Sequence, residues 1–213
     1  EDKQKQKLYC DSTTLSTEWQ ELPNEALSTK KKAIVFATAL KYPDKNRYVD
    51  VLPFESTRVP IQPNEKNEDG YINASFISLP HSKGIATQGP LPQSFNDFWQ
   101  MVWENKVRII VMLTKLRERQ RIKAHCYWPV DGLSEKFGDI TVQSVSTKVK
   151  DHYAIRKFTL SREGCEKQRT LYQIQYTEWP DFGVPSSPQP ILELLDTIEK
   201  HSQKLKLKPS KKR

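Results

Sequence analysis

Cysteine and histidine are the residue types in this sequence best suited to metal binding or nucleophilic chemistry. The 213-residue chain contains three cysteines, Cys10, Cys126 and Cys165, and four histidines. No Cys-x2-Cys pair and no pair of histidines at a zinc-ligand spacing occurs, so no zinc site is expected. Three cysteines cannot all pair, and nothing indicates a secreted disulfide framework. We therefore expect a reducing compartment and no metal or other cofactor.

The positive charge of the chain is concentrated at one end. The net charge is +8, which alone suits nucleic acid, an anionic membrane or an anionic substrate equally well. Residues 200–213 contain seven Lys or Arg and no acid, so the rest of the chain is nearly neutral. No nucleic-acid-binding pattern is present, and residues 211–213 form either a nuclear-localisation-like patch or a solubilising end. The longest aliphatic run, Ile109–Leu113, is far below the ~20 residues of a membrane span.

Apolar residues at helical spacing predict two helices that must position any site. The first covers residues 93–106, and Ser94 with Asp97 is expected to form a capping box at its start. The second covers Ser187–Lys200. Each carries an apolar stripe wide enough to require burial. The stripes consist of Phe95, Phe98, Trp99, Val102 and Trp103, and of Ile191, Leu194, Leu195 and Ile198.

Four segments have the composition or alternation of strands. Val107–Thr114 is predicted to be a central strand buried on both faces. Further strands are predicted at Phe137–Val145, His152–Ser161 and Thr170–Trp179. The fold class is therefore α/β of the α+β type, with a twisted, mixed, largely antiparallel sheet flanked by helices.

Seven short motifs follow one another between residues 45 and 185. They are KNRYVDVLP at 45–53, GYINASFI at 70–77, IATQGPL at 85–91, DFW and MVWE within 97–104, IVMLT at 110–114, KAHCYWP at 123–129 and WPDFGVP at 179–185. In this order they strongly resemble the catalytic domain of the cysteine-dependent, tyrosine-specific protein phosphatases. The resemblance implies that family's fold and hydrolysis of phosphotyrosine in proteins through a cysteinyl-phosphate intermediate.

The resemblance implies a substrate-recognition role for two residues of the first motif. Tyr48 would flank the phenyl ring of phosphotyrosine and line a slot too deep for phosphoserine to reach its base. Asp50 would accept hydrogen bonds from the backbone of the bound peptide. Three further motif residues, Arg47, Asn73 and Gln88, are interpreted as structural hydrogen-bonding groups, and Asn73 is expected to brace the Tyr48 loop.

The resemblance also implies an acid and a neighbouring cation. Asp181 matches the general acid that protonates the phenolate leaving group, a contribution of typically ~10²–10⁴-fold. Its loop would be framed by Trp179, Pro180, Phe182 and Gly183. Lys123 matches a lysine near that aspartate, where it would hold the carboxylate or attract phosphate. Without the motifs, a surface turn at Asp181 and a solvated charge at Lys123 would be the preferred interpretations.

Two positions depart from the family pattern. Gly84 stands where the family usually has an aromatic residue, and Ala124 stands where it usually has cysteine. We expect both to change packing rather than chemistry.

The nucleophile of the family is missing from these 213 residues. Its signature is His-Cys-x5-Arg, whose thiolate, backbone N–H cradle and arginine hold the phosphate. None of the three cysteines is followed six residues later by Arg. We expect the domain to be incomplete at its C-terminus and this chain to be inactive by itself. An exposed strand edge would follow, because the missing strand would leave its neighbours unpaired.

The predicted organisation has three parts. They are a polar N-terminal arm at 1–15, a partial phosphatase domain at 16–199 and a basic tail at 200–213. The expected partners are phosphotyrosine-containing proteins or peptides, with no specific nucleic acid and no transmembrane segment. The alternative to a phosphatase is a catalytically dead interaction isoform with a basic, nuclear-localising tail. The expected location is the cytoplasm, with the nucleus as the alternative.

Overall fold

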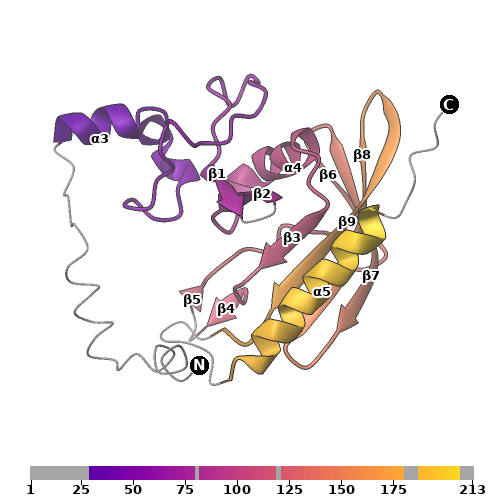
Figure 1. Cartoon of the computed structure of the whole chain (residues 1–213). Coiled ribbons are helices and arrows are strands. Elements are labelled where there is room, and N and C mark those ends of the chain that lie inside the picture. The colour runs from indigo at the N-terminus through magenta and orange to yellow at the C-terminus, as the bar shows by residue number, and fades with distance from the viewer. Residues whose placement is uncertain (1–28, 80–81, 119–120, 180–186, 207–213) are drawn as a thin grey trace, which may run out of the picture. The chain divides into compact units, whose positions relative to one another are not determined.

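A computed structural model describes residues 29–79, 82–118, 121–179 and 187–206 (Figure 1). The chain divides into two units, 1–34 and 35–213. Helix α3 (Thr29–Val35) contains the described residues of the first unit. The predicted arm at 1–15 and the residues Pro180 to Gly183 lie outside the described residues. Everything below concerns the unit from Val35 onward.

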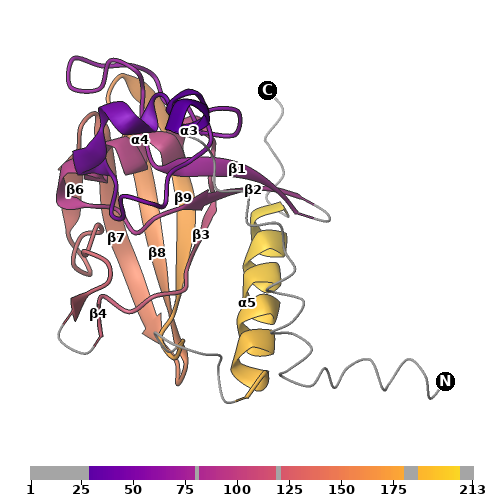
Figure 2. The same ribbon diagram turned by 90° about the vertical axis from the view of Figure 1, so that its left-hand side faces the viewer.

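The centre of this unit is a five-stranded sheet with the order β3-β9-β8-β7-β6 (Figures 1 and 2). Strands β6 to β9 form an antiparallel meander, whereas β3 runs parallel to β9. The predicted mixed, largely antiparallel sheet is therefore confirmed. The strands are β3 (Ile109–Met112), β6 (Ser134–Phe137), β7 (Ile140–Val149), β8 (Tyr153–Arg162) and β9 (Cys165–Tyr176).

Two short hairpins and several single turns complete the described part of this unit. Strands β1 (Ala74–Leu79) and β2 (Ser82–Thr87) pair with each other, as do β4 (Arg117–Glu118) and β5 (Arg121–Ile122). Three 3-10 turns occur, η2 (Ala39–Lys41), η3 (Pro43–Lys45) and η4 (Pro92–Ser94). The loop that contains Tyr48 follows η3 and lies beside the ends of β1 and β2, where Asn73 and Gln88 bond to it.

Alternation along β7 places one row of side chains in the core. Ile140, Val142 and Ser144 are all buried, as their spacing predicted. The predicted start of this strand was wrong, because Phe137 ends β6 rather than beginning β7. Gly138 lies between the two strands with φ +63°, a conformation that glycine adopts without steric cost and that turns the hairpin here.

Helix α4 (Phe95–Glu104) covers one face of the sheet with its apolar stripe. Trp99 is fully buried, and its indole Nε1 donates to the Tyr127 carbonyl over 2.8 Å. The capping-box prediction was wrong. The Ser94 hydroxyl bonds back to the Leu91 backbone, and the Asp97 carboxylate turns away to bind other partners. A buried cation offered that carboxylate a stronger interaction than the helix terminus did.

Helix α5 (Gln189–Lys206) lies on the opposite face, against β3 and β9 (Figure 2). Leu194, Ile191 and Ile198 pack with Ile174 and Tyr176. The helix extends six residues beyond the predicted end at Lys200, so part of the predicted basic tail is helical. No Pro or Gly occurs between Lys200 and Pro209, and lysine is a good helix former. Lysines near the C-terminus of a helix also interact favourably with its dipole.

The prediction of a central strand at Val107–Thr114 was also wrong. Strand β3 lies at the edge of the described sheet, not at its centre, because β9 is the strand that pairs with it. Its Val111 side chain is 41% exposed, although Met112 is buried. A run of β-branched residues indicates burial, but it does not show whether both neighbouring strands are present. No helix in the described residues is long and apolar enough to cross a membrane.

Candidate functional site

Two of the predicted substrate-binding residues, from distant parts of the sequence, line one pocket. Tyr48 and Lys123, 75 positions apart, both face a cavity of about 530 Å³. The Tyr48 side chain is 52% exposed, so its ring is accessible to a ligand. The other lining residues are Arg47, Val51, Leu52, Pro53, Asn73, Ser75, Ala86, Thr87, Gln88, Gly89 and Thr114. The lining includes two cationic side chains and no acidic one, which suits an anionic ligand.

An asparagine pair holds the Tyr48 loop from inside. The Asn73 amide donates to the Val51 carbonyl over 2.8 Å and to Asn46 Oδ1 over 3.0 Å. Asn46 in turn donates to the carbonyls of Ala39 and Tyr42. The predicted bracing role of Asn73 is thus confirmed. Asn46 was not singled out from the sequence, since a lone asparagine before Arg47 carries no distinguishing signal.

The other side of the loop is clamped by Gln88 and Arg47. Gln88 Oε1 accepts from the Arg47 backbone N–H over 2.8 Å, and its amide donates to the Lys45 carbonyl over 2.8 Å. The Arg47 guanidinium donates to the carbonyls of Gly89 and Pro90. Burial lowers the pKa of Arg47 from its usual value. Both residues therefore act as structural hydrogen-bonding groups, as the sequence indicated.

A buried ion pair anchors the start of the same loop. Lys45 Nζ lies 3.0 Å from Asp97 Oδ2, with side-chain exposures of 10% and 7%. The other carboxylate oxygen accepts from the Asn67 amide over 2.9 Å. Because all of these groups are satisfied, the pair ties the Tyr48 loop to helix α4 without leaving a bare buried charge.

Lys123 reaches the pocket from the segment after β5 (Arg121–Ile122). Its backbone N–H donates to the Leu116 carbonyl over 2.9 Å, which fixes the main chain at this point. The next residue, Ala124, is buried. A β carbon built on Gly89 would lie 3.1 Å from that of Ala124. The departure at Ala124 therefore concerns packing beneath the pocket.

A polar network that the sequence did not reveal supports the pocket from β8 and β9. Arg156 donates to the side-chain oxygens of Gln173 and Gln175 over 3.0 and 2.9 Å, and its guanidinium stacks over the Trp128 ring. Gln175 donates to the carbonyl of Thr114, which lines the pocket. Burial lowers the pKa of Arg156. Two glutamines alternating on a strand would be the signal for a buried polar row, but alternation also suits an exposed face.

Among the remaining predicted site residues, those that the structure describes do not line the pocket. Asp50 is exposed and does not line the pocket. Asp181, with Pro180, Phe182 and Gly183, lies outside the described residues. Trp179 is described, and its ring meets Tyr176 edge to face. The roles of Asp50 and Asp181 therefore stay predictions.

The described cysteines lie away from the pocket. Cys126 and Cys165 are free thiols, and neither lines the cavity that contains Tyr48. Cys126 Sγ donates weakly to the Trp128 carbonyl over 3.5 Å. Cys165 begins β9 and packs against the core under α4. Neither has the Gly-rich turn and following helix that a phosphate-binding nucleophile needs.

Comparison with known proteins agrees with this geometry. Residues 42–211 match the model of the protein-tyrosine phosphatase family, and the chain belongs to that family. Similar curated proteins include tyrosine-protein phosphatase Lar of Drosophila melanogaster, 44% identical over 154 residues, which are 71% of this chain and 8% of that protein. Receptor-type tyrosine-protein phosphatase H of Homo sapiens is 39% identical over 178 residues, 82% of this chain and 16% of that protein. The chain thus matches a small part of the length of these relatives.

Proposed function

We propose that this chain supplies the phosphotyrosine-recognition slot and the general acid of a protein-tyrosine phosphatase site. In the complete domain such a site hydrolyses phosphotyrosine in proteins through a cysteinyl-phosphate intermediate. The observation that carries the proposal is the meeting of Tyr48 and Lys123 in one pocket, within a stretch that matches the family model.

Recognition follows from the shape and charge of the pocket. The Tyr48 ring is exposed toward the cavity while its loop is held by Asn73, so it stacks on a substrate ring with little loss of conformational freedom. Lys123 adds a positive charge that attracts the phosphate. The slot distinguishes phosphotyrosine from phosphoserine because the shorter side chain leaves its phosphate away from the base. Asp50 orients the peptide backbone at the rim.

Asp181 supplies the proton for the leaving group. As the P–O bond breaks, the phenolate oxygen takes a proton from the carboxylic acid and departs as a neutral phenol. The phosphoryl group passes to a cysteine thiolate, and water then releases it as inorganic phosphate.

We infer that residues 1–213 do not carry out this reaction by themselves. They contain no cysteine followed six residues later by arginine, and the two described cysteines lie outside the pocket. The same lack of a nucleophile favours a second candidate, an interaction protein that recognises phosphotyrosine weakly in the cytoplasm or, through its basic C-terminal residues, in the nucleus.

Phosphate release and calorimetry on the purified 213-residue chain test both candidates. A phosphotyrosine peptide should show no turnover and weak binding that depends on the phosphate. Tyr48→Ala should weaken that binding severalfold, whereas Val49→Ala, an exposed neighbour outside the pocket, should leave it unchanged.

Three results would contradict the proposal. Turnover that Asp181→Ala abolishes would show that the chain is catalytically competent. Micromolar, phosphate-dependent affinity would show that the recognition half does not need the missing cradle. Equal binding of the phosphorylated and unphosphorylated peptides would remove the recognition role itself.

A further inference from the structure

A histidine contacts the guanidinium that clamps the Tyr48 loop. His125 Nδ1 lies 3.3 Å from Nη2 of Arg47, although the two residues are 78 positions apart in the chain. Arg47 directly precedes Tyr48, and its guanidinium ties the loop to the carbonyls of Gly89 and Pro90. His125 is half-buried, so its ring can still exchange protons with solvent. The histidine therefore touches the residue that fixes the position of the loop.

The partner of His125 determines which form of the imidazole fits the structure. A guanidinium carries N–H donors and no acceptor, so Nδ1 must be the acceptor of this hydrogen bond. Nδ1 can accept only while it carries no proton, which means a neutral ring with its proton on Nε2. A proton on Nδ1 would remove the bond and place two cations in contact, so attraction at these atoms would become repulsion.

The loop that faces His125 offers no acid to offset a second positive charge. Asp50 is exposed and does not line the pocket that Arg47 lines. Lys45 is already paired with Asp97. The ion pairs of the described residues include neither Arg47 nor His125. Burial already disfavours the charged guanidinium and lowers the pKa of Arg47, so a neighbouring cation adds to an existing cost.

The other two segments at this contact offer no acid either. Residues 85–91, whose carbonyls accept from Arg47, contain no ionisable side chain. Within two positions of His125, the ionisable residues are Lys123, Cys126 and Tyr127. A protonated His125 would therefore lie against a guanidinium, close in sequence to a lysine, with no described carboxylate as its partner.

We propose that His125 is a positioning residue that holds the Tyr48 loop through Arg47 while its ring is neutral and loosens the loop when its ring is protonated. This inference rests on the proposed function of Tyr48. Histidine side chains gain a proton as the pH falls from about 8 to about 5. The hydrogen bond is present at the upper end of this range and is lost toward the lower end. Phosphotyrosine then binds more weakly, because the loop must be ordered again on binding.

An NMR titration of the 213-residue chain between about pH 8 and about pH 5.5 tests the coupling without a ligand. The ring Cε1–H of His125 and the amides of Arg47, Tyr48 and Gly89 should titrate together with one midpoint. His125→Gln keeps a side-chain acceptor that does not titrate, and it should remove this step from the amides. His152→Gln changes a histidine between β7 and β8, outside the pocket, and should leave the step in place.

A phosphotyrosine peptide, titrated into the same samples, links the coupling to recognition. Its phosphate gains a proton near a pH of about 6, so variants are compared at equal pH, where this effect cancels. At the upper pH the parent and His125→Gln should bind equally. At the lower pH the parent should bind about threefold more weakly than His125→Gln. His125→Lys places a permanent cation beside Arg47 and should bind about threefold more weakly than the parent at the upper pH.

Three results would overturn the proposal. They are loop amides that do not titrate with His125, a titration step that persists in His125→Gln, and equal affinities of the parent and His125→Lys at the upper pH. The ligand-free titration decides the matter even where His125→Lys fails to fold. If the loop amides titrate with His125 but no phosphotyrosine peptide binds at either pH, the proposed function fails and the positioning of the loop by His125 remains supported.

Discussion

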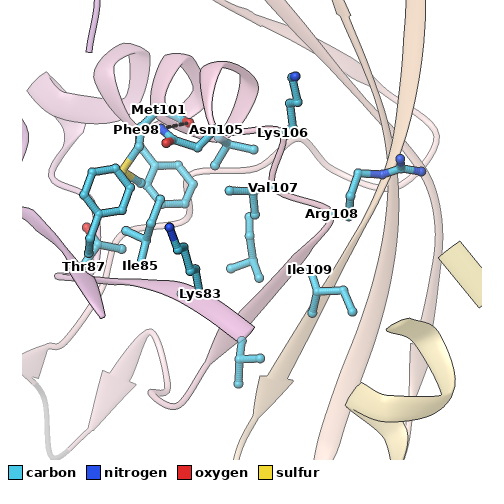
Figure 3. A pocket seen from close by; sticks show the side chains of 15 residues that line it. Lys83, Ile85, Thr87, Phe98, Met101, Asn105, Lys106, Val107, Arg108 and Ile109 are labelled. Carbon is cyan, nitrogen blue, oxygen red and sulfur yellow. Dashed lines mark hydrogen bonds between the residues drawn. The ribbon is translucent and has the colours of Figure 1, made fainter. Parts of the chain in front are cut away.

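The loop around Tyr48 lies close to a groove of about 520 Å³ that is lined by residues of β2, α4 and β3 (Figure 3). The two regions differ in how their backbone polar groups are satisfied. In the loop, Asn73, Gln88 and Arg47 bond the main chain from both sides. In the groove, two strand edges have no strand partner among the described residues. A loop without regular structure is thus the firmly held region, whereas regular strands form the open one.

This difference shows that regular secondary structure does not by itself mean that the backbone polar groups have hydrogen-bond partners. Side-chain amides can replace a ladder wherever the main chain is irregular, because each amide both donates and accepts. Along a strand edge, every second residue leaves its backbone N–H and C=O without a partner in the sheet. A further strand pairs with all of these groups at once. The loop is therefore held in one conformation by its side-chain partners, whereas the strand edges at the groove keep backbone groups without a described partner.

The largest effect is expected from removing the cation that anchors the loop. Lys45→Ala leaves the Asp97 carboxylate buried beside Asn67 and should lower the free energy of unfolding by about 3–5 kcal/mol. Urea denaturation measures the loss. Lys136→Ala removes one half of an exposed pair with Glu163 and should cost at most about 1 kcal/mol. Equal losses for the two variants would contradict the view that the loop is anchored from the core.

A strong effect is also expected at Gly70, which lies three residues after Asn67. Its φ is +56°, and a β carbon there would lie 1.9 Å from the Ile61 carbonyl oxygen. Gly70→Ala should cost more than about 2 kcal/mol in urea denaturation, since the clash adds to the left-handed strain. Gly164→Ala has φ +70° but open space around it, so only the strain of about 1–2 kcal/mol applies. A larger loss at Gly164 would reverse the expected order.

An intermediate effect is expected at Asn73. Asn73→Ala removes the side-chain donor to the Val51 carbonyl and one of the two donors to Asn46 Oδ1, which keeps its bond from the Tyr71 hydroxyl. The loss should cost about 1–3 kcal/mol. Hydrogen exchange should accelerate in residues 47–52 and stay unchanged in β7. Uniform acceleration across both regions would mean that Asn73 stabilises the whole fold and not the loop.

The smallest effect is expected in the groove, and it has the opposite sign. Lys106 ends helix α4 at φ +54°, where its N–H and that of Val107 bond back to Trp103 and Val102. This is a helix-ending arrangement that usually uses glycine. Lys106→Gly should therefore raise the free energy of unfolding by about 1 kcal/mol, as urea denaturation measures.

A neighbouring position serves as the control for Lys106. Asn105→Gly lies at φ −83° and should give no gain in stability, because the parent residue is unstrained there. If both glycine variants stabilise the chain to the same extent, the left-handed strain at Lys106 is not the cause.

Much of the fold could be predicted because side-chain periodicity is local. The apolar stripe of α4, the buried row of β7 and the antiparallel meander all follow from residue types within single segments. Errors occurred where a distant partner decided the outcome. Asp97 left the helix cap for Lys45, fifty-two positions earlier, and α5 continued through lysines that had been assigned to a tail.

For the site, the ordered motifs singled out Tyr48 and Lys123 separately and did not show that the two line one pocket. The supporting groups were harder to find, because Asn46, Gln173 and Gln175 are common residue types whose roles depend on neighbours in space. The accessibility of the Tyr48 ring likewise depends on Asn73 and Gln88, which come from other segments.

By itself, the sequence determined the family, the order of the motifs, the confinement of the charge to one end and the lack of a Cys-x5-Arg. These are properties of residue order, which no folding can alter. Only the tertiary structure decided that Val107–Thr114 contains an edge strand, that Gly84 lines a groove and that Lys45 forms a buried ion pair with Asp97. Each of these features depends on which backbone segment or charged side chain lies next to it in the folded chain. Hydrogen bonds and ion pairs form only between groups that folding brings within a few ångströms of each other.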